Sequence, residues 1–377
     1  MKRIFQFLIL ALPLTVFAKD GAIQNTMLEV YASFKDLQPY LIDSSRFEDA
    51  QNQKKIKKLV SKLSAELHGA ESFDTKYRKL PGFNAQMTSL AEMLDEVNKG
   101  FETNSAGWSL WRLRAISNNC QTCHTGYGVD VRFTDKNVNL DKLDSLSKGE
   151  FYLASRQYPS AQAAFFQAAI NPPTGHSSLE ALRKWLIIYT RVNNDPQQAL
   201  FKLDFILQKK TNLRPYEREE ISDWVIALRR WSTEKDEEKD TLSKAESLLR
   251  KALDVQMPYF GKVGAVELLR STALLHEVLD DTKLSDEKRR RALYLIGLSY
   301  SKLPLFFVNE LPELFLEQCI REYPNTLEAK NSFKLIKEIL ITGYTGSSGA
   351  HIPGEVDVKL EELYKVAYGE QELKDQV

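Results

Sequence analysis

The sequence predicts an all-α protein, and two observations support this prediction. Between residues 20 and 128, apolar residues recur at spacings of three and four, which is the period of one face of an α-helix. From residue 142 onward, small and large residues recur in the pattern of stacked helical hairpins. With 43% hydrophobic residues in a chain of 377, both parts can build hydrophobic cores. The expected architecture is a four-helix bundle followed by an α-solenoid.

Four amphipathic helices are expected in the first part. The third shows the pattern most clearly, because its apolar residues follow a strict 4-3-4-3-4 spacing behind the turn Leu80-Pro81-Gly82. The fourth begins after Ser105, whose side chain can cap a helix. The four apolar stripes are Ile23, Met27, Val30, Phe34, Leu37 and Leu41; Ile56, Leu59, Val60, Leu63 and Leu67; Phe83, Met87, Leu90, Leu94, Val97 and Phe101; and Trp108, Trp111, Leu113 and Ile116. Short loops between them favour an antiparallel bundle.

The second part contains an internal repeat. If Lys142 is the first position of a unit of about 34 residues, its characteristic positions are filled by Gly149, Tyr152, Tyr158, Ala161, Phe165, Ala168 and Pro173. Small residues let the two helices of a unit approach closely, large ones fill the groove, and the proline ends the second helix. Looser units contain Ala199, Leu203 and Ile206; Ala245, Leu249 and Ala252; and Gly297, Tyr300, Leu316, Cys319 and Pro324. The pattern resembles the tetratricopeptide (TPR) repeat. We expect about three to five hairpins over residues 142–370, with an irregular helical domain as the alternative.

The segment Cys120-Gln121-Thr122-Cys123-His124 is the most specific motif in the chain. Cys-x-x-Cys-His is the attachment signal of a covalently bound c-type haem. Two thiols three positions apart project from the same side of a helical turn, so they can add to the two vinyl groups of one porphyrin while His124 ligates its iron. A thioredoxin-like redox pair would need a strand before the helix, and a zinc site would need two further ligands. The expected cofactor is one haem c, held by Cys120, Cys123 and His124.

A four-helix bundle with this motif near the end of its last helix resembles the class II cytochromes c, the cytochrome c′ and c556 type. The resemblance covers residues 19–128 and rests on the helix order and on Cys120, Cys123 and His124. That family often has a basic residue four positions after the ligating histidine. This chain has Gly128 there, with Arg132 as the nearest candidate, so the environment of the haem propionates stays open.

The topology also suggests a second iron ligand. An up-down-up-down bundle brings together the start of its first and third helices and the end of its second and fourth. Met27, His68 and Met87 fall at that end, whereas Met93 lies further away and is expected in the core. Met27, which matches the axial methionine of c556-type proteins, and His68 are the candidate distal ligands. Alternatively, the methionines are core residues and His68 caps its helix. If none binds, the iron is five-coordinate and gas binding becomes more plausible.

Residues 1–18 predict a Sec signal peptide. Lys2 and Arg3 precede an apolar run over residues 4–14, and Val16-Phe17-Ala18 fits a signal-peptidase site. Haem c is attached outside the cytoplasm, so the leader and the attachment motif agree, and the expected compartment is a bacterial periplasm. The 51 basic and 51 acidic residues provide no net charge that would attract nucleic acid or an anionic membrane. No second apolar stretch approaches the ~20 residues that a transmembrane helix needs.

These observations predict four segments: a signal peptide at 1–18, a class II-like cytochrome domain at 19–128, a linker at 129–141 and a TPR-like domain at 142–370. We expect an exported mono-haem one-electron carrier or redox component, docked by the TPR-like domain to a redox protein or peptide. A bundle with its own core would retain haem without the TPR-like domain. The alternatives are a haem-based gas or redox sensor, and an assembly scaffold with a mainly structural haem. Catalytic turnover is less expected, because no acid-base pair is recognisable.

For several other residues and segments the sequence indicates only a structural role. Cys319 takes a small-residue position and is expected to be a buried, unpaired thiol. The glycine-rich residues 343–349 lack the Gly-Lys-Ser/Thr ending of a phosphate loop and predict a flexible connection to a last helix over residues 356–368. The charged run 234–240 predicts a solvated loop. His176, His276 and His351 show no metal-ligand spacing.

Overall fold

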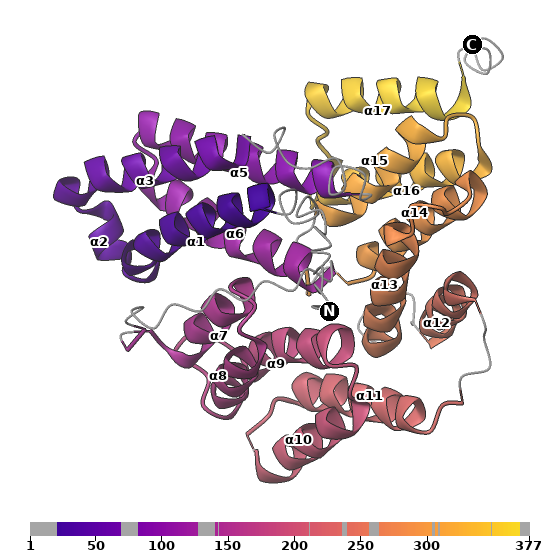
Figure 1. Cartoon of the computed structure of the whole chain (residues 1–377), viewed down its shortest axis with the longest axis horizontal. Helices are drawn as coiled ribbons and strands as arrows, with labels where there is room; N and C mark the ends of the chain where they lie inside the picture. The colour runs from indigo at the N-terminus through magenta and orange to yellow at the C-terminus, as the bar shows by residue number, and fades with distance from the viewer. Residues whose placement is uncertain are drawn as a thin grey trace, which may run out of the picture.

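The computed structural model describes residues 21–68, 82–126, 140–141, 143–210, 212–235, 240–255, 264–303, 306–307, 310–347 and 349–369. These residues form an all-α fold, as predicted (Figure 1). The strands in the described ranges are the two-residue β1 (Thr345–Gly346) and β2 (Gly349–Ala350). The expected signal peptide and most of the expected linker lie outside the described residues. No helix in the described ranges is both long enough and apolar enough to cross a membrane.

The first part of the chain folds into a four-helix bundle. Its helices are α1 (Gly21–Ile42), α3 (Ala50–His68), α5 (Phe83–Glu102) and α6 (Ala106–Gly126), with a short α2 (Ser44–Glu48) between α1 and α3. Every member of the apolar stripe predicted for the third helix is buried. The fourth stripe was predicted only in part: Leu113 and Ile116 are buried, whereas Trp108 and Trp111 are 43% and 61% exposed. The buried face of α6 carries Leu110, Leu113 and Ile116, which follow a three-residue spacing.

The second part is a succession of helices that mostly pack against their neighbours along the chain, except that α11 and α12 both pack against α13. They are α7 (Ser145–Ala154), α8 (Tyr158–Ile170), α9 (Ser178–Ile187), the π-helical turn η2 (Ile188–Val192), α10 (Pro196–Lys209), α11 (Pro215–Ser232), α12 (Thr241–Val255), α13 (Ala265–Asp280), α14 (Asp286–Ser301), α15 (Leu311–Glu322), α16 (Leu327–Gly343) and α17 (Gly354–Tyr368). We call α7–α17 the array. In the glycine-rich connection that precedes the last helix, β1 and β2 pair antiparallel with Thr345 opposite Ala350.

Two hairpins of the array pack through the residues that the repeat pattern singled out. A Cβ atom on Gly149 of α7 would collide with the Phe165 ring of α8, and one on Gly297 of α14 would collide with the Leu316 side chain of α15. Small residues at these positions therefore allow the close helix approach that the pattern predicted. Cys319, also on α15, is a free and fully buried cysteine, as expected.

The array bends around the end of the bundle that carries the attachment motif (Figure 1). Its first helix, α7, contacts α6; η2 and α13 contact the same helix; and α15 contacts α5. The end of α6 therefore lies on the inner side of the arc. At the α15 contact, the Gly82 amide donates to Gln318 Oε1 at 2.6 Å. Gly82 has φ +77°, and a Cβ there would overlap the Phe315 ring, so this junction requires glycine.

Candidate functional site

The attachment motif occupies the last two turns of α6. Cys120 and Cys123 are partly buried, and neither forms a disulfide. Burial, reinforced by the neighbouring Cys123, raises the pKa of Cys120 to about 12. Burial likewise raises the pKa of Cys123 to about 11. Both side chains are therefore neutral thiols at neutral pH.

His124 is held by the first hairpin of the array. Its Nδ1 lies 2.6 Å from the Ala154 carbonyl oxygen at the end of α7, and the Tyr158 hydroxyl donates to the His124 carbonyl at 3.0 Å. A carbonyl oxygen can only accept a hydrogen bond, so Nδ1 carries the proton and the lone pair lies on Nε2. Burial, together with the charge of Arg156, lowers the pKa of His124 to about 3. The imidazole is therefore neutral, which is the form that ligates a metal.

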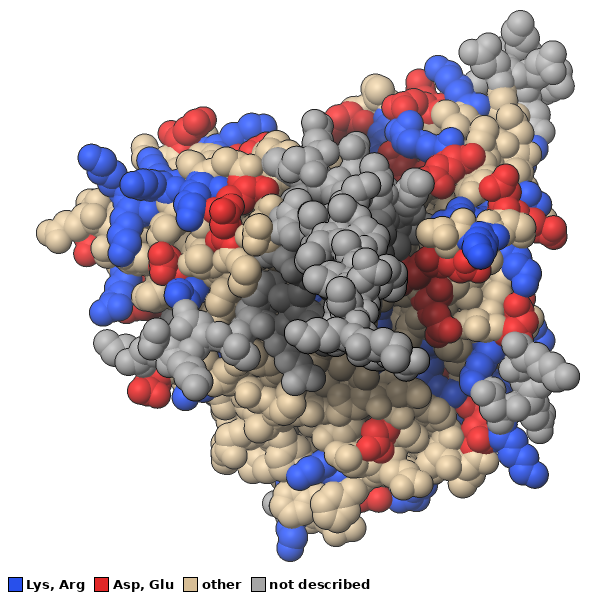
Figure 2. Space-filling view, in the orientation of Figure 1, with Lys and Arg blue, Asp and Glu red and all other residues tan. Residues whose placement is uncertain are grey.

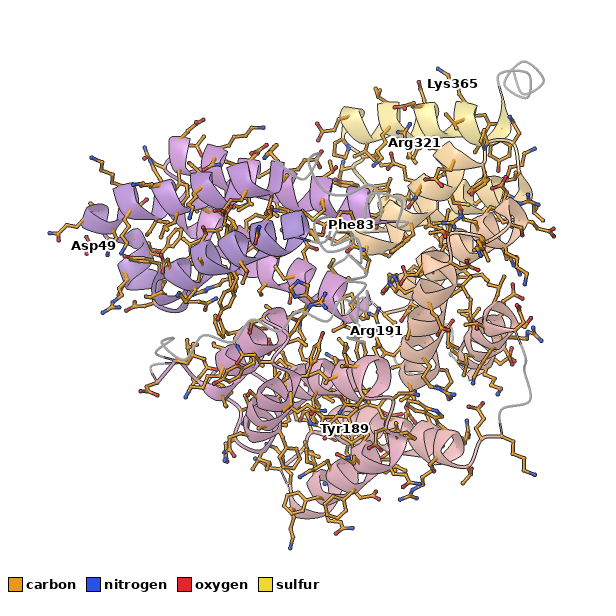
Figure 3. The ribbon with its side chains drawn as sticks, in the orientation of Figure 1. Asp49, Phe83, Tyr189, Arg191, Arg321 and Lys365 are labelled. Carbon is orange, nitrogen blue, oxygen red and sulfur yellow. The ribbon has the colours of Figure 1, made fainter. Side chains whose placement is uncertain are left out.

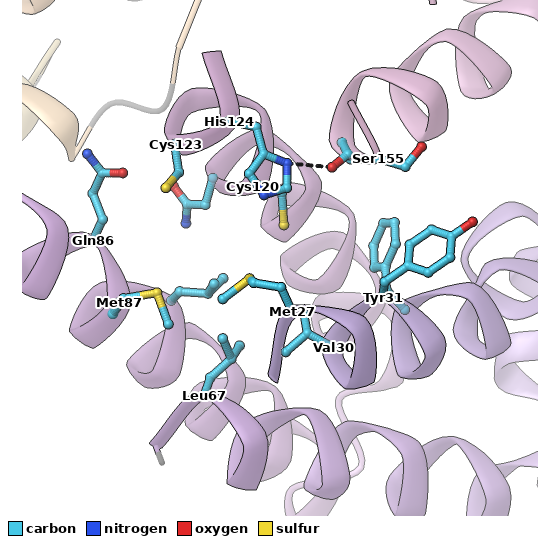
Figure 4. Close-up of a pocket in the computed structure, with 14 residues that line it drawn as sticks. Met27, Val30, Tyr31, Leu67, Gln86, Met87, Cys120, Cys123, His124 and Ser155 are labelled. Carbon is cyan, nitrogen blue, oxygen red and sulfur yellow. Dashed lines mark hydrogen bonds between the residues drawn. The ribbon is translucent and has the colours of Figure 1, made fainter. Parts of the chain in front are cut away.

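The two cysteines and His124 face a cavity between α1, α5, α6 and the end of α7 (Figure 4). The cavity has a volume of about 70 Å³, which is smaller than the ~300–1,000 Å³ typical of cofactor sites, so a bound porphyrin would need the side chains around it to move apart. Its apolar lining includes Met27, Val30, Phe34, Leu67, Met87 and Leu90. Met27 and Met87 lie on the opposite side of the cavity from the Cys-x-x-Cys-His segment (Figure 4). Two thiols and an imidazole on one side therefore face two thioethers on the other.

This donor set fits a covalently attached haem. The apolar wall suits the flat face of a porphyrin, the thiols suit its vinyl groups, and nitrogen and sulfur are common axial ligands of haem iron. The side-chain amide of Gln86 gives a further indication. Both its nitrogen and its oxygen are buried at the cavity, and neither has a hydrogen-bond partner among the described residues. Because buried amides are normally paired, a polar group inside the cavity would satisfy it.

His68 and Met93 lie elsewhere. His68 does not line the cavity; its Nε2 is 3.2 Å from Asp95 Oδ2 on α5, and its Nδ1 is 3.0 Å from the Ser64 carbonyl oxygen. Met93 is buried in the bundle core, as predicted, and its sulfur accepts from Asn119 Nδ2 at 2.7 Å. The structure thus brings Met27 and Met87 together with the attachment motif, and leaves His68 paired with Asp95.

Sequence reasoning missed the contribution of the array to this site. Ala154 and Ser155 complete the cavity wall, although both lie beyond the segment assigned to the haem domain. Phe151 of α7 is buried in the bundle core, where its ring stacks on Phe34 with centroids 6.5 Å apart. Tyr158 occupies a characteristic repeat position, but no sequence pattern indicates that its hydroxyl reaches His124. The site is therefore built from both halves of the chain.

A second link joins α6 to the array. Lys184 of α9 donates to Asn118 Oδ1 at 2.5 Å and to Gln121 Oε1 at 2.8 Å, so its ammonium group bonds to one residue just before the motif and to one within it. Burial lowers the pKa of Lys184, whereas the charge of Glu150 acts in the opposite direction. These bonds fix the rotation of α6 relative to α9.

Comparison with known proteins did not identify a relative of this chain. No protein-family model matches the chain, and no curated protein or solved structure shows significant similarity to it.

Proposed function

We propose that the protein is an exported mono-haem c-type cytochrome that carries one electron at a time. The observation that carries this proposal is the cavity in which Cys120, Cys123 and His124 of α6 face Met27 of α1. Bound there, haem would supply the one-electron chemistry of its iron. The apolar leader at residues 1–18 supports export to a periplasm, where such attachment occurs.

In this proposal each residue of the site has a distinct role. Cys120 and Cys123 form the two thioether bonds, and His124 offers Nε2 because Ala154 holds the proton on Nδ1. Met27 offers a thioether sulfur from the other side of the cavity. The surrounding apolar side chains exclude water, and a dry, sulfur-ligated site favours a higher reduction potential than a hydrated, histidine-ligated one.

The array would serve the haem site and a partner together. Its first hairpin holds His124, and its inner side packs on α6, so a redox partner would dock on its outer surface. Figure 2 shows charges of both signs over the bundle and over α13–α17, and few over the part of this face formed by α8–α10. A partner recognised there would rely less on charge than one bound over the bundle or over α13–α17. TPR-like arrays commonly bind proteins or peptides.

A haem-based gas sensor is the second candidate, and the amide of Gln86 favours it. This amide is an unpaired hydrogen-bond donor at the cavity. A donor in the distal pocket stabilises a small polar ligand bound to iron. In that case Met27 would be a wall residue and the iron would keep an open position.

Optical spectra of the full chain in both oxidation states test the proposal. The protein should be produced with its leader in a bacterium that has an active c-type haem maturation system. An electron carrier is expected to be six-coordinate and low-spin, with reversible reduction and no carbon monoxide binding at rest. A five-coordinate ferrous form that binds carbon monoxide would select the sensor. Irreversible reduction with retained haem would select a scaffold in which haem is structural.

A further inference from the structure

Arg191 is a partly buried cation beside the end of the attachment helix, with its Nε and Nη1 atoms shielded from water. It lies on η2, which contacts both α6 and α13, and Figure 3 shows it at the junction between the bundle and the array. A Cβ atom placed on Gly126, two residues after His124, would lie 3.3 Å from Arg191 Nη2 and 3.0 Å from His276 Nε2. Single π-helical turns are rare and frequently mark functional sites.

Arg191 belongs to a hydrogen-bonded cluster with Tyr300 and His276. Its Nη2 donates to the Tyr300 hydroxyl oxygen at 3.1 Å, and that oxygen lies 2.7 Å from His276 Nε2. Burial and the charge of Arg191 hold the pKa of His276 well below its usual value, while burial raises the pKa of Tyr300. Both partners are therefore neutral. The cluster keeps one positive charge, on Arg191.

No side chain in the described ranges balances this charge. Arg191 forms no ion pair there, and its Nε and Nη1 are shielded from water without a hydrogen-bond acceptor. The guanidinium carbon lies 5.0 Å from the centre of the Phe307 ring and 5.9 Å from that of Tyr300, so aromatic faces offset part of the desolvation. A charged group that is shielded from water is normally paired with an opposite charge. The guanidinium group of arginine is planar, and its N–H donors match the two oxygens of a carboxylate.

We propose that Arg191 binds a carboxylate at the end of α6. A monoanion would balance the single charge of the cluster, and the aromatic wall suits a carboxylate on an apolar body better than a strongly hydrated dianion. The carboxylate has two possible sources: a propionate of haem attached at Cys120 and Cys123, which rests on the proposed function, or a free carboxylate anion. Either source would fill the same unsatisfied donors.

Three variants of the full chain test this site. Arg191→Gln removes the charge, and Arg191→Lys keeps the charge but loses the planar guanidinium group that can donate two parallel hydrogen bonds. Arg230→Gln, which removes an exposed arginine of α11, is the matched control. Reduction potential and thermal unfolding are measured in carboxylate-free buffer. Both are repeated with sodium acetate and with sodium chloride at equal ionic strength.

If Arg191 binds a haem propionate, Arg191→Gln lowers the reduction potential and the unfolding temperature in carboxylate-free buffer, because it leaves the propionate unpaired, and Arg191→Lys is intermediate. The wild-type values are then insensitive to acetate. A free anion makes acetate, but not chloride, lower the potential and raise the unfolding temperature, and Arg191→Gln abolishes both responses.

The proposal is overturned if, in carboxylate-free buffer, Arg191→Gln lowers neither the unfolding temperature nor the potential relative to Arg230→Gln, and acetate also leaves both wild-type values unchanged. Failure of the proposed function is a separate result, because the protein would then lack haem altogether. In that case acetate-dependent unfolding of the wild type, absent in Arg191→Gln, still supports the site, and its absence rejects it.

Discussion

Met27 and Met87 both present a thioether to the cavity, but they come from different helices and have different exposures. Met87 is 7% exposed and belongs to the continuous apolar stripe of α5, whereas Met27 of α1 is only partly buried. A side chain that is almost fully buried in a continuous apolar stripe contributes mainly to the core. We therefore propose Met27, rather than Met87, as the sulfur ligand.

The first prediction separates these two sulfurs. Met27→Ala should abolish the sulfur-to-iron charge-transfer band and lower the reduction potential, whereas Met87→Ala, the matched control, should keep the band and lose stability by about 2–5 kcal/mol. His68→Ala should change neither the charge-transfer band nor the reduction potential, since His68 lies outside the cavity and pairs with Asp95. Optical titration measures band and potential together. Loss of low-spin character in His68→Ala alone would disprove the assignment.

Glu313 of α15 carries a second prediction, which concerns pH. It lines an open cleft together with Tyr300, Lys302 and Glu338, and its Oε2 has no hydrogen-bond partner among the described residues. Burial, with a contribution from the charge of Glu310, raises the pKa of Glu313 to about 7. The folded state therefore binds this proton more tightly than the unfolded state, in which the carboxyl titrates near its ordinary value of about 4.5. Stability is lost as pH rises from about 4.5 to 7 and is then constant.

Replacing Glu313 by Gln removes that penalty. We expect Glu313→Gln to stabilise the protein at pH 8 by on the order of 2 kcal/mol and to have little effect at pH 4. Glu338→Gln, an exposed residue of the same cleft, should show no such difference. Urea unfolding at the two pH values gives both free energies. An equal effect of Glu313→Gln at both would argue against a raised pKa.

Helix packing in the array depends on the absence of a side chain at Gly149. The Phe165 ring of α8 occupies the space where a Cβ would lie. Since α7 also positions the Ala154 carbonyl against His124, a shift of this helix would reach the candidate site. Packing between α7 and α8 and the orientation of the histidine are therefore coupled.

A third prediction follows from this packing. Gly149→Ala should destabilise the protein by about 1–3 kcal/mol, because the added methyl group overpacks the α7–α8 contact. The matched control is Gly107→Ala in α6, where the site is exposed and no atom lies within 4 Å of the new Cβ. That control should be neutral or stabilising by up to about 1 kcal/mol, as alanine favours the helix. Denaturant midpoints compare the two, and equal midpoints would contradict the packing argument.

Local patterns predicted the helices better than their faces or ends. The stripe of α5 was predicted completely, since its spacing is regular and both neighbours bury it. In α6 the large Trp108 and Trp111 were mistaken for core residues, although each lies next to the buried positions Ser109 and Leu110. The β1–β2 pair was missed because two-residue strands have no periodicity to detect. The Cys-x-x-Cys-His motif could be recognised because its spacing is local.

Contacts between distant parts of the chain could not be predicted in this way. Gly82 meets Gln318, Arg112 pairs with Glu310, and His124 bonds to Ala154, and no repeat or periodic pattern relates these positions. The sequence suggested a haem domain that is complete by residue 128. The structure instead places Leu143 and Phe151 in the bundle core. The bundle and the array are therefore expected to unfold together.

The fourth prediction tests this dependence with two fragments. Residues 19–135 alone should give less holoprotein and a perturbed spectrum, because they lack Phe151, Ala154 and Tyr158. Residues 19–171, which add α7 and α8, should recover the spectrum of the full chain. Haem content per mole and the optical spectrum are measured for each. A native spectrum from the shorter fragment would show that the array is dispensable for the haem site.

The central claim is that one haem is covalently bound through Cys120 and Cys123. The most direct test is the intact mass of the acid-denatured full chain, purified from cells with active c-type haem maturation. We expect the mass of one polypeptide plus one haem, and we expect Cys120→Ala/Cys123→Ala to show the polypeptide mass alone. A wild-type protein that is folded and haem-free under these conditions would contradict the claim.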